Sequence, residues 1–147
     1  MAITSTSAIE SEIVQLVLCS RITNPQDANR LEQDIDHIMR HGRTENARLG
    51  ITGALLTDRT SFAQVIEGPI ASIEGMYSRI ADDKRHHGVE LLQHVITHVR
   101  LLPFWALAFV EVGRIPGIGR VNGCNTPLDR RKACISVLAA LRPLLLG

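Results

Sequence analysis

The sequence predicts an α+β fold in which a ferredoxin-like βαββαββ sheet carries two helices on one face. Three patterns support this prediction. Ile13–Cys19 is apolar at nearly every position, as expected for a central strand covered on both faces. A hairpin pattern surrounds Asp58–Thr60, and two amphipathic helical patterns alternate with the strands. A C-terminal helix is expected on the other sheet face or at a dimer interface.

The first helix is expected to follow a polar lead, Ala2–Ser11, and the first strand. Asn24 is the predicted N-cap, with Pro25 at the first helical position. Gly42 would suit a helix end, but it continues the apolar stripe together with Asn46, so the helix is predicted to run on. A glycine on the inward face leaves a gap for a ligand, into which Asn46 would reach.

The hairpin is expected to pair Ile51–Thr57 with Ser61–Glu67. Alternation along the second strand places Gln64 on one face with Phe62 and Ile66. A buried amide without hydrogen-bond partners costs ~1–3 kcal/mol, so Gln64 suggests a polar ligand above the sheet. An edge position with the amide in water is the alternative.

The second helix is expected from Ile70 to about Asp82, with a core stripe of Ile73, Tyr77 and Ile80. A neighbouring stripe carries Gly75, Arg79 and Asp83 among others. Two helices with glycines on adjoining faces would flank a flat ligand over the sheet. The alternative is that each glycine merely lowers helix propensity by ~1 kcal/mol.

Two further strands, Val89–Val99 and Trp105–Val112, complete the predicted sheet. A third helix should begin at the Thr126 cap and bury a stripe of Ile135, Leu138, Leu141 and Leu145, and Pro143 should end or bend it. The expected division is a domain over residues 1–112, then a connecting loop and C-terminal helix over residues 113–147. The glycines of Gly113–Asn125 indicate a turn-rich connection rather than a phosphate loop.

The composition excludes several classes of function. The chain has 147 residues, 45% of them apolar, and a net charge of +1 with scattered basic residues, which does not suggest nucleic-acid binding. No apolar run is long enough to span a membrane. The three cysteines lack metal-binding spacing, and the adjacent pair His86–His87 is not typical of a metal site either. A reducing, cytoplasmic setting is expected.

Several ordered motifs resemble the BLUF family of flavin-binding blue-light sensors. They are the pattern N-A-R-x-x-x-T-G-x-L-L from Asn46, F-x-Q-x-x-E-G-P from Phe62, the run Leu16–Arg21, the run Asp83–His86 and the run Pro103–Phe109. The resemblance therefore covers about the first 110 residues. It implies a non-enzymatic blue-light signalling module that binds FAD, with FMN as the alternative, through this arrangement of strands and helices.

The resemblance also implies roles for single residues. Asn46 and Gln64 match the amides that hydrogen-bond the polar edge of the flavin, and amides supply donors and acceptors without net charge. Arg79, Asp83 and His86 match positions around the ribityl chain and phosphate, for which a guanidinium is suited. An exposed Arg79–Asp83 ion pair is the alternative. Trp105 matches the family's semi-conserved tryptophan, and Leu107 lies where a methionine is usual.

The chain departs from the family pattern at Leu18. BLUF photochemistry begins at a tyrosine two residues before the serine of the first strand, here Ser20, and that tyrosine hydrogen-bonds the glutamine. Leu18 has no phenol, so the photocycle is expected to be impaired or altered, with slow photoreduction through Trp105 at most. Glu45 is a second departure, because the family usually has Asn or His there beside the flavin.

Two hypotheses follow. The chain is a BLUF-type flavin sensor with an altered photocycle, or a flavin-free, light-insensitive module for protein interaction. A hydrolase of the acylphosphatase type is a distant third, because no arginine-bearing phosphate loop follows the first strand. Expected partners are the flavin, a downstream protein and a second copy of the chain in a homo-oligomer.

Overall fold

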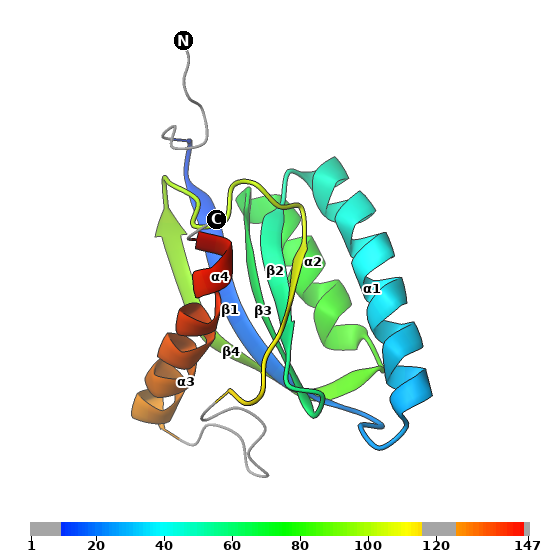
Figure 1. Ribbon diagram of the computed structural model, residues 1–147. Helices are drawn as coiled ribbons and strands as arrows, with labels where there is room; N and C mark the ends of the chain where they lie inside the picture. Colours follow the sequence, from blue (N-terminus) through cyan, green and yellow to red (C-terminus); the bar gives the residue numbers. More distant parts are fainter. Residues whose placement is uncertain (1–9, 116–125, 146–147) are drawn as a thin grey trace.

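A computed structural model describes residues 10–115 and 126–145 and places one five-stranded sheet between two layers of helices (Figure 1). The strands are β1 (Ile13–Ile22), β2 (Thr52–Thr57), β3 (Ser61–Gly68), β4 (His86–Thr97) and β5 (Ala108–Glu111). Their order across the sheet is β4-β1-β3-β2-β5, and β5 pairs parallel to β2 while the other pairs are antiparallel. The predicted ferredoxin-like α+β fold is confirmed.

β1 is an interior strand of the sheet, covered on both faces as its sequence predicts, although β3 is the middle strand of the five. All its residues from Ile13 to Ser20 are buried, and it pairs with β3 on one side and β4 on the other. Leu16 and Leu18 belong to the core under α2 (Ile70–Asp82), whereas Val17 and Cys19 belong to the core on the opposite face. Covering both faces explains why the strand is apolar at successive positions.

α1 (Ala28–Leu49) continues through Gly42 as predicted, but its cap differs from the prediction. The N-cap is Asp27, whose carboxylate accepts a hydrogen bond from the Arg30 N–H at 3.0 Å. Asn24 instead lies one turn earlier, and its carbonyl accepts from the Asp27 N–H. The helix ends at Gly50, whose φ of 71° is in the left-handed region that glycine adopts readily.

α2 has the predicted bounds, but one expected feature of it is wrong. Ile73 and Met76 are buried, and Tyr77 and Ile80 pack against the same cluster. Gly75 is exposed, and a Cβ built there would meet nothing within 4 Å. The glycine of α2 therefore faces solvent and opens no space over the sheet.

β4 begins three residues before the predicted start, and β5 begins at Ala108 instead of Trp105. The carbonyls of Trp105, Ala106 and Leu107 accept hydrogen bonds from the Gly53 N–H, the Asn46 amide and the Arg43 guanidinium, respectively. The segment before β5 is thus bonded to α1 and to the start of β2. This fixes Leu107 beside Gly42.

α3 (Pro127–Ala140) lies on the sheet face opposite α1 and α2, and the short α4 (Arg142–Leu145) follows it (Figure 1). The Thr126 cap is confirmed, with its hydroxyl accepting from the Asp129 N–H at 3.0 Å. α3 ends before Pro143, as predicted. Much of Gly113–Asn125, including Cys124, and most of Ala2–Ser11 lie outside the described residues.

The predicted apolar stripe of the C-terminal helix is wrong in part. Ile135 and Leu145 are exposed, at 61% and 48%. Its buried residues are Ala133, Cys134, Val137 and Leu141, with Leu138 partly buried. The side of α3 that carries Ala133, Val137 and Leu141 faces the sheet, and Ile135 lies on the opposite side of the helix.

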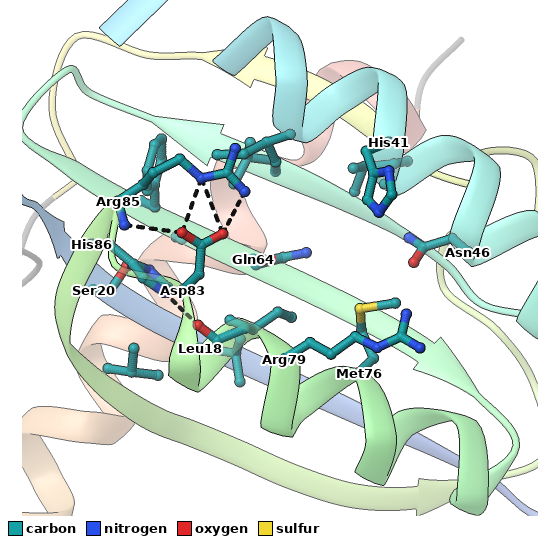
Figure 2. A pocket seen from close by; sticks show the side chains of 18 of the residues that line it. Leu18, Ser20, His41, Asn46, Gln64, Met76, Arg79, Asp83, Arg85 and His86 are labelled. Carbon is teal, nitrogen blue, oxygen red and sulfur yellow. Dashed lines mark hydrogen bonds and ion pairs between the residues drawn. The ribbon is translucent and has the colours of Figure 1, made fainter. Parts of the chain in front are cut away.

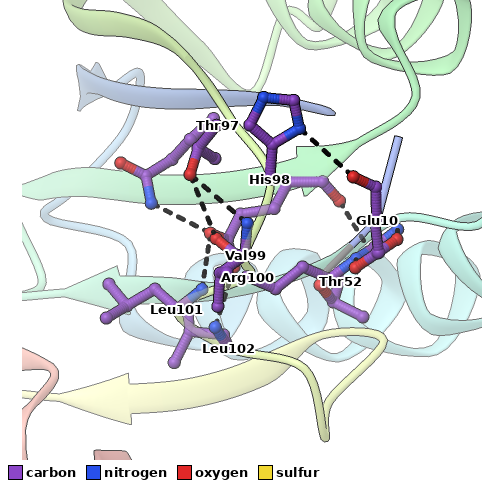
Figure 3. Close-up of polar contacts among 10 residues, drawn as sticks. Glu10, Thr52, Thr97, His98, Val99, Arg100, Leu101 and Leu102 are labelled. Atoms are coloured by element: carbon purple, nitrogen blue, oxygen red, sulfur yellow. Dashed lines mark hydrogen bonds and ion pairs between the residues drawn. The ribbon is translucent and has the colours of Figure 1, made fainter. Parts of the chain in front are cut away.

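A polar cluster around Glu67 of β3 fixes the loop between β4 and β5. The fully buried carboxylate of Glu67 accepts hydrogen bonds from Gln15 and from the backbone N–H groups of Leu101 and Leu102, at 2.8–2.9 Å. Arg100 bonds Glu10 and Thr52 at the end of the sheet (Figure 3). These donors satisfy a buried charge and hold the loop that leads to Leu107.

Candidate functional site

A cavity of about 150 Å³ lies between α1 and α2 above the sheet (Figure 2). Six of the residues predicted for a ligand site or its chemistry line it: Leu18, Asn46, Gln64, Arg79, Asp83 and His86. They come from β1, α1, β3, α2, the residue after α2 and the first residue of β4, so the fold brings together residues far apart in sequence. The cavity joins an apolar interior to a charged rim.

The predicted site residue Trp105 does not line this cavity. It lies before β5, packs against the core cluster that contains α3, and meets Phe104 edge-to-face at 6.0 Å between ring centroids. Leu107, two residues later, lines the cavity instead. The expectation that Trp105 serves as an electron donor beside a ligand in this cavity is therefore not supported by its position.

The floor of the cavity contains Gln64, on the same sheet face as Phe62 and Ile66, as the alternation predicts. Its direct partners across the sheet are Leu18 on β1 and Leu55 on β2. The half-buried amide of Gln64 makes no hydrogen bond to another residue within the described ranges, and it extends into the cavity (Figure 2). Two N–H donors and a carbonyl acceptor are thus directed at the space above the sheet.

Asn46 is 2% exposed, and its Nδ2 donates to the Ala106 carbonyl at 2.7 Å. Part of its hydrogen-bonding capacity is therefore used within the protein. The gap expected above Gly42 is also smaller than predicted, because a Cβ at Gly42 would lie 2.7 Å from Leu107 Cδ2. Gly42 admits Leu107 to the wall of the cavity.

An ion pair joins the two helices at the rim. Glu45 on α1 meets the guanidinium of Arg79 on α2 at 2.9 Å, and also pairs with Arg48. Hydrogen bonds from Arg48 and then Arg79 lower the pKa of Glu45 from 4.5 to about 2. The Glu45 carboxylate is thus held in its ionised form by two arginines, one from each helix. The Arg79–Asp83 ion pair, which the sequence offered as the alternative, is not formed, because Arg79 pairs with Glu45 and Asp83 with Arg85.

Asp83 pairs with Arg85, two residues later, at 2.5 Å. The hydrogen bond from Arg85 lowers the pKa of Asp83, and the same contact raises the pKa of Arg85. Arg85 also reaches His37 on α1, at 2.7 Å between Nη1 and Nδ1. The loop after α2 is in this way tied to α1 across the end of the cavity.

His86 is held by two contacts. Its Nδ1 lies 2.7 Å from the Ser20 hydroxyl, and its Nε2 lies 2.5 Å from the Ile80 carbonyl. Because a carbonyl only accepts, Nε2 carries a hydrogen and donates it to Ile80, while the Ser20 hydroxyl is the partner of Nδ1. His86 is therefore oriented at the cavity wall by β1 and α2. The part of the chain that the structure describes contains no group of three or more metal-ligating side chains.

Sequence reasoning missed Arg85 and His41, which also line the cavity. His41 lies four residues before Glu45 and so shares its side of α1, a signal that helical spacing provides. The signal for Arg85 was weaker, since it only lies between the predicted site residues Asp83 and His86. Its pairing with Asp83 depends on the conformation of the loop after α2, which the sequence does not reveal.

Known proteins share this architecture. A family model for sensors of blue light using FAD, named BLUF, matches residues 13–108. The photoactivated adenylate cyclase subunit beta of Euglena longa is 34% identical over 99 residues, which are 67% of this chain and 11% of that protein. The chain thus spans about a tenth of the length of the curated relatives that it matches.

Solved structures agree with the family match. The dark-state structure of BlrB, a BLUF protein, has a TM-score of 0.66 and 29% identity over 88% of this chain and 98% of that chain. Klebsiella pneumoniae BlrP1 with FMN and cyclic diGMP has a TM-score of 0.63 and 24% identity, covering 88% of this chain and 34% of that chain. The second likeness concerns the fold alone.

Proposed function

This chain belongs to the BLUF family, the sensors of blue light using FAD, and we propose that it binds a flavin in the cavity between α1 and α2. The observation that carries the proposal is the amide of Gln64, which is directed into an otherwise apolar part of the cavity without a protein partner in the described ranges. A bound group with alternating donors and acceptors would satisfy it. FAD is the proposed flavin and FMN the alternative.

The residues around the cavity fit such a group. The Gln64 amide, and the donor and acceptor capacity of the Asn46 amide that its bond to Ala106 leaves unused, suit the polar edge of the ring. Ile38, Phe62 and Met76 supply apolar contact for its faces. Arg79, Asp83 and His86 are proposed to hold the ribityl and phosphate part. When bound, the flavin supplies absorption of blue light and redox chemistry.

We further propose that Leu18 impairs the photocycle. A side chain at position 18 lies directly opposite Gln64, so a phenol there would reach the amide. Leucine can neither donate a hydrogen bond to Gln64 nor supply an electron and a proton. Light would then leave the amide in its resting hydrogen bonds.

The chain is proposed to sense and signal rather than to catalyse. The cyclase relatives are far longer proteins, and the match covers 11% of their length. A downstream protein partner, a homo-oligomer, a cytoplasmic setting and a division near residue 112 are parts of the same proposal. Within residues 10–115 and 126–145, no helix combines the length and apolar character that crossing a bilayer requires.

A flavin-free interaction module is the second candidate. The observation that favours it is the ion pair between Glu45 and Arg79, because Arg79, which is proposed to bind the ligand phosphate, already has a carboxylate partner. Leu107 beside Gly42 also reduces the space available. In this alternative the helices close over the sheet and the surface of the module carries its function.

An absorption spectrum of the purified protein distinguishes the two candidates. The flavin proposal expects yellow protein with flavin bands, or flavin-free protein that binds added flavin with micromolar or better affinity. Colourless protein that takes up no flavin at saturating concentration would overturn it and favour the interaction module.

A further inference from the structure

A second cavity, also of about 150 Å³, adjoins the first along α1. Ile22 and Leu31, both nearly fully buried, form its apolar part. The first cavity is lined by α1 residues from Ile38 to Asn46, and the second by Arg30, Leu31 and Asp34 of the same helix. The two cavities therefore follow one another along the axis of α1.

Asp83 and Arg85 line both cavities and form the partition between them. Arg85 holds Asp83 on one side and contacts His37 of α1 on the other, at 2.7 Å. The Thr23 hydroxyl donates to the Lys84 carbonyl at 2.9 Å, and the Thr23 N–H donates to the Arg85 carbonyl at 3.0 Å. The partition is thus anchored to the end of β1, and it places a guanidinium between the two spaces.

The charges of the second cavity favour an anionic ligand. Three cations, Arg30, Lys84 and Arg85, face two carboxylates, Asp34 and Asp83. Arg30 and Asp34 form a loose pair at 3.5 Å, with the Arg30 side chain 59% exposed. Exposed pairs of this kind are weak, so phosphate oxygens can compete with Asp34 for the guanidinium.

From this arrangement we propose that the second cavity receives the AMP half of FAD, whose FMN half occupies the first cavity. The inference rests on the proposed flavin binding and deepens it, because it makes Arg30 and Lys84 the residues that select FAD over FMN. A mononucleotide ends at its phosphate beside the partition, and it leaves both residues without a ligand. The apolar pair Ile22 and Leu31 offers contact for part of the adenosine.

The test is titration of the flavin-free full chain with FAD, FMN and riboflavin, followed by quenching of flavin fluorescence. In Arg30→Gln and Lys84→Gln, the Kd for FAD should rise by about two- to five-fold each, the effect of one exposed charge pair. The Kd for FMN and for riboflavin should stay unchanged, which also shows that the variants fold.

Two matched controls separate local contact from net charge. Arg40→Gln removes an arginine that pairs with Asp36 on α1, four residues away as in the Arg30–Asp34 pair, and lines neither cavity. Lys132→Gln removes an exposed lysine of α3. Both should leave all three affinities unchanged.

Each outcome decides the question. If Arg30→Gln and Lys84→Gln weaken the binding of FAD and FMN equally, or weaken neither, the second cavity does not hold the AMP half, while the proposed flavin binding stands. If the wild-type chain binds none of the three flavins, the proposed function fails and this inference fails with it.

Discussion

Leu18 on β1 and Gln64 on β3 are direct partners across the sheet, and both line the cavity between α1 and α2. Directly opposite side chains in antiparallel strands have Cβ atoms about 4.5–5.5 Å apart, so residue 18, with Leu55 on the other side, forms the immediate surroundings of the Gln64 side chain. Leu18 is 2% exposed and offers that amide an apolar neighbour without a hydrogen bond. No hydrogen bond from another residue of the described ranges therefore fixes the orientation of Gln64.

Loss of the two amides should weaken flavin binding. In Asn46→Ala/Gln64→Ala, we expect the Kd for flavin to rise about ten-fold or more, because each lost hydrogen bond contributes ~0.5–1.5 kcal/mol. Gln64→Ala alone should lower affinity with an unchanged melting temperature. Gln33→Ala, an exposed amide on α1, is the control. Unchanged flavin occupancy in the double variant would contradict the placement of the flavin.

The Glu45 carboxyl should titrate far below the usual range of glutamates. Its folded-state pKa of about 2 lies below its ordinary value of 4.5, owing first to Arg48 and then to Arg79. A lowered pKa means that the stabilisation is present above about pH 4.5 and is lost as the pH falls toward 2. Carboxyl carbon NMR shifts in a pH titration measure this directly.

Glu45→Gln should remove this part of the acid sensitivity and, by freeing Arg79, increase affinity for phosphorylated flavins relative to riboflavin. Glu74→Gln, at an exposed position of α2, should change neither property. A Glu45 carboxyl that titrates near 4.5 would show that the bridge between α1 and α2 does not persist in solution.

The order and faces of the strands were predictable because burial leaves a direct pattern in sequence. Ile13–Ser20 lies in an interior strand and is largely apolar on both faces, and Gln64 interrupts an apolar face where the cavity lies. The cap of α1 was not predictable in the same way. Asn24 and Asp27 both have side chains that accept from a helix N–H, and the turn at Pro25 decides between them.

The charged part of the site was less predictable than its polar floor. Arg79 has Asp83 one helical turn away, yet it pairs with Glu45 of another helix, which depends on how α1 and α2 pack. Trp105 and Leu107 have side chains on different sides of their segment because its carbonyls bond α1 and β2. For α3, hydrophobicity favoured Ile135, whereas close packing selected Ala133, Cys134 and Val137.

The buried face of α3 should be needed for stability. Val137 is fully buried in the core cluster, so Val137→Ala should lower the free energy of unfolding by about 1–3 kcal/mol. Ile135→Ala, at a position that is 61% exposed, should change it by about 0.5 kcal/mol or less. Chemical denaturation measures both.

Truncation after Asn125 should have the larger effect, because it uncovers Val17, Val65 and their neighbours on the sheet. Each such side chain contributes ~1.5–3 kcal/mol when buried, so the truncated protein should aggregate or melt at lower temperature. A soluble truncated chain with the wild-type melting temperature would mean that α3 is an appendage.

The response to light should depend on residue 18. Flavin-loaded wild-type protein should lack the small, reversible red shift of the flavin band, because Leu18 supplies neither an electron and proton nor a hydrogen bond to Gln64. Leu18→Tyr should restore the shift, since the new phenol lies directly opposite the amide and the cavity beside it offers room for the ring. Leu18→Phe is the matched control, because it adds the ring without the hydroxyl and should remain without the shift. Difference spectra before and after blue illumination of all three proteins decide the matter. A full reversible red shift with Leu18 in place would show that this protein's light response does not need a tyrosine at position 18. Trp105 would not explain such a shift, because it packs against the core cluster that contains α3 and does not line the cavity.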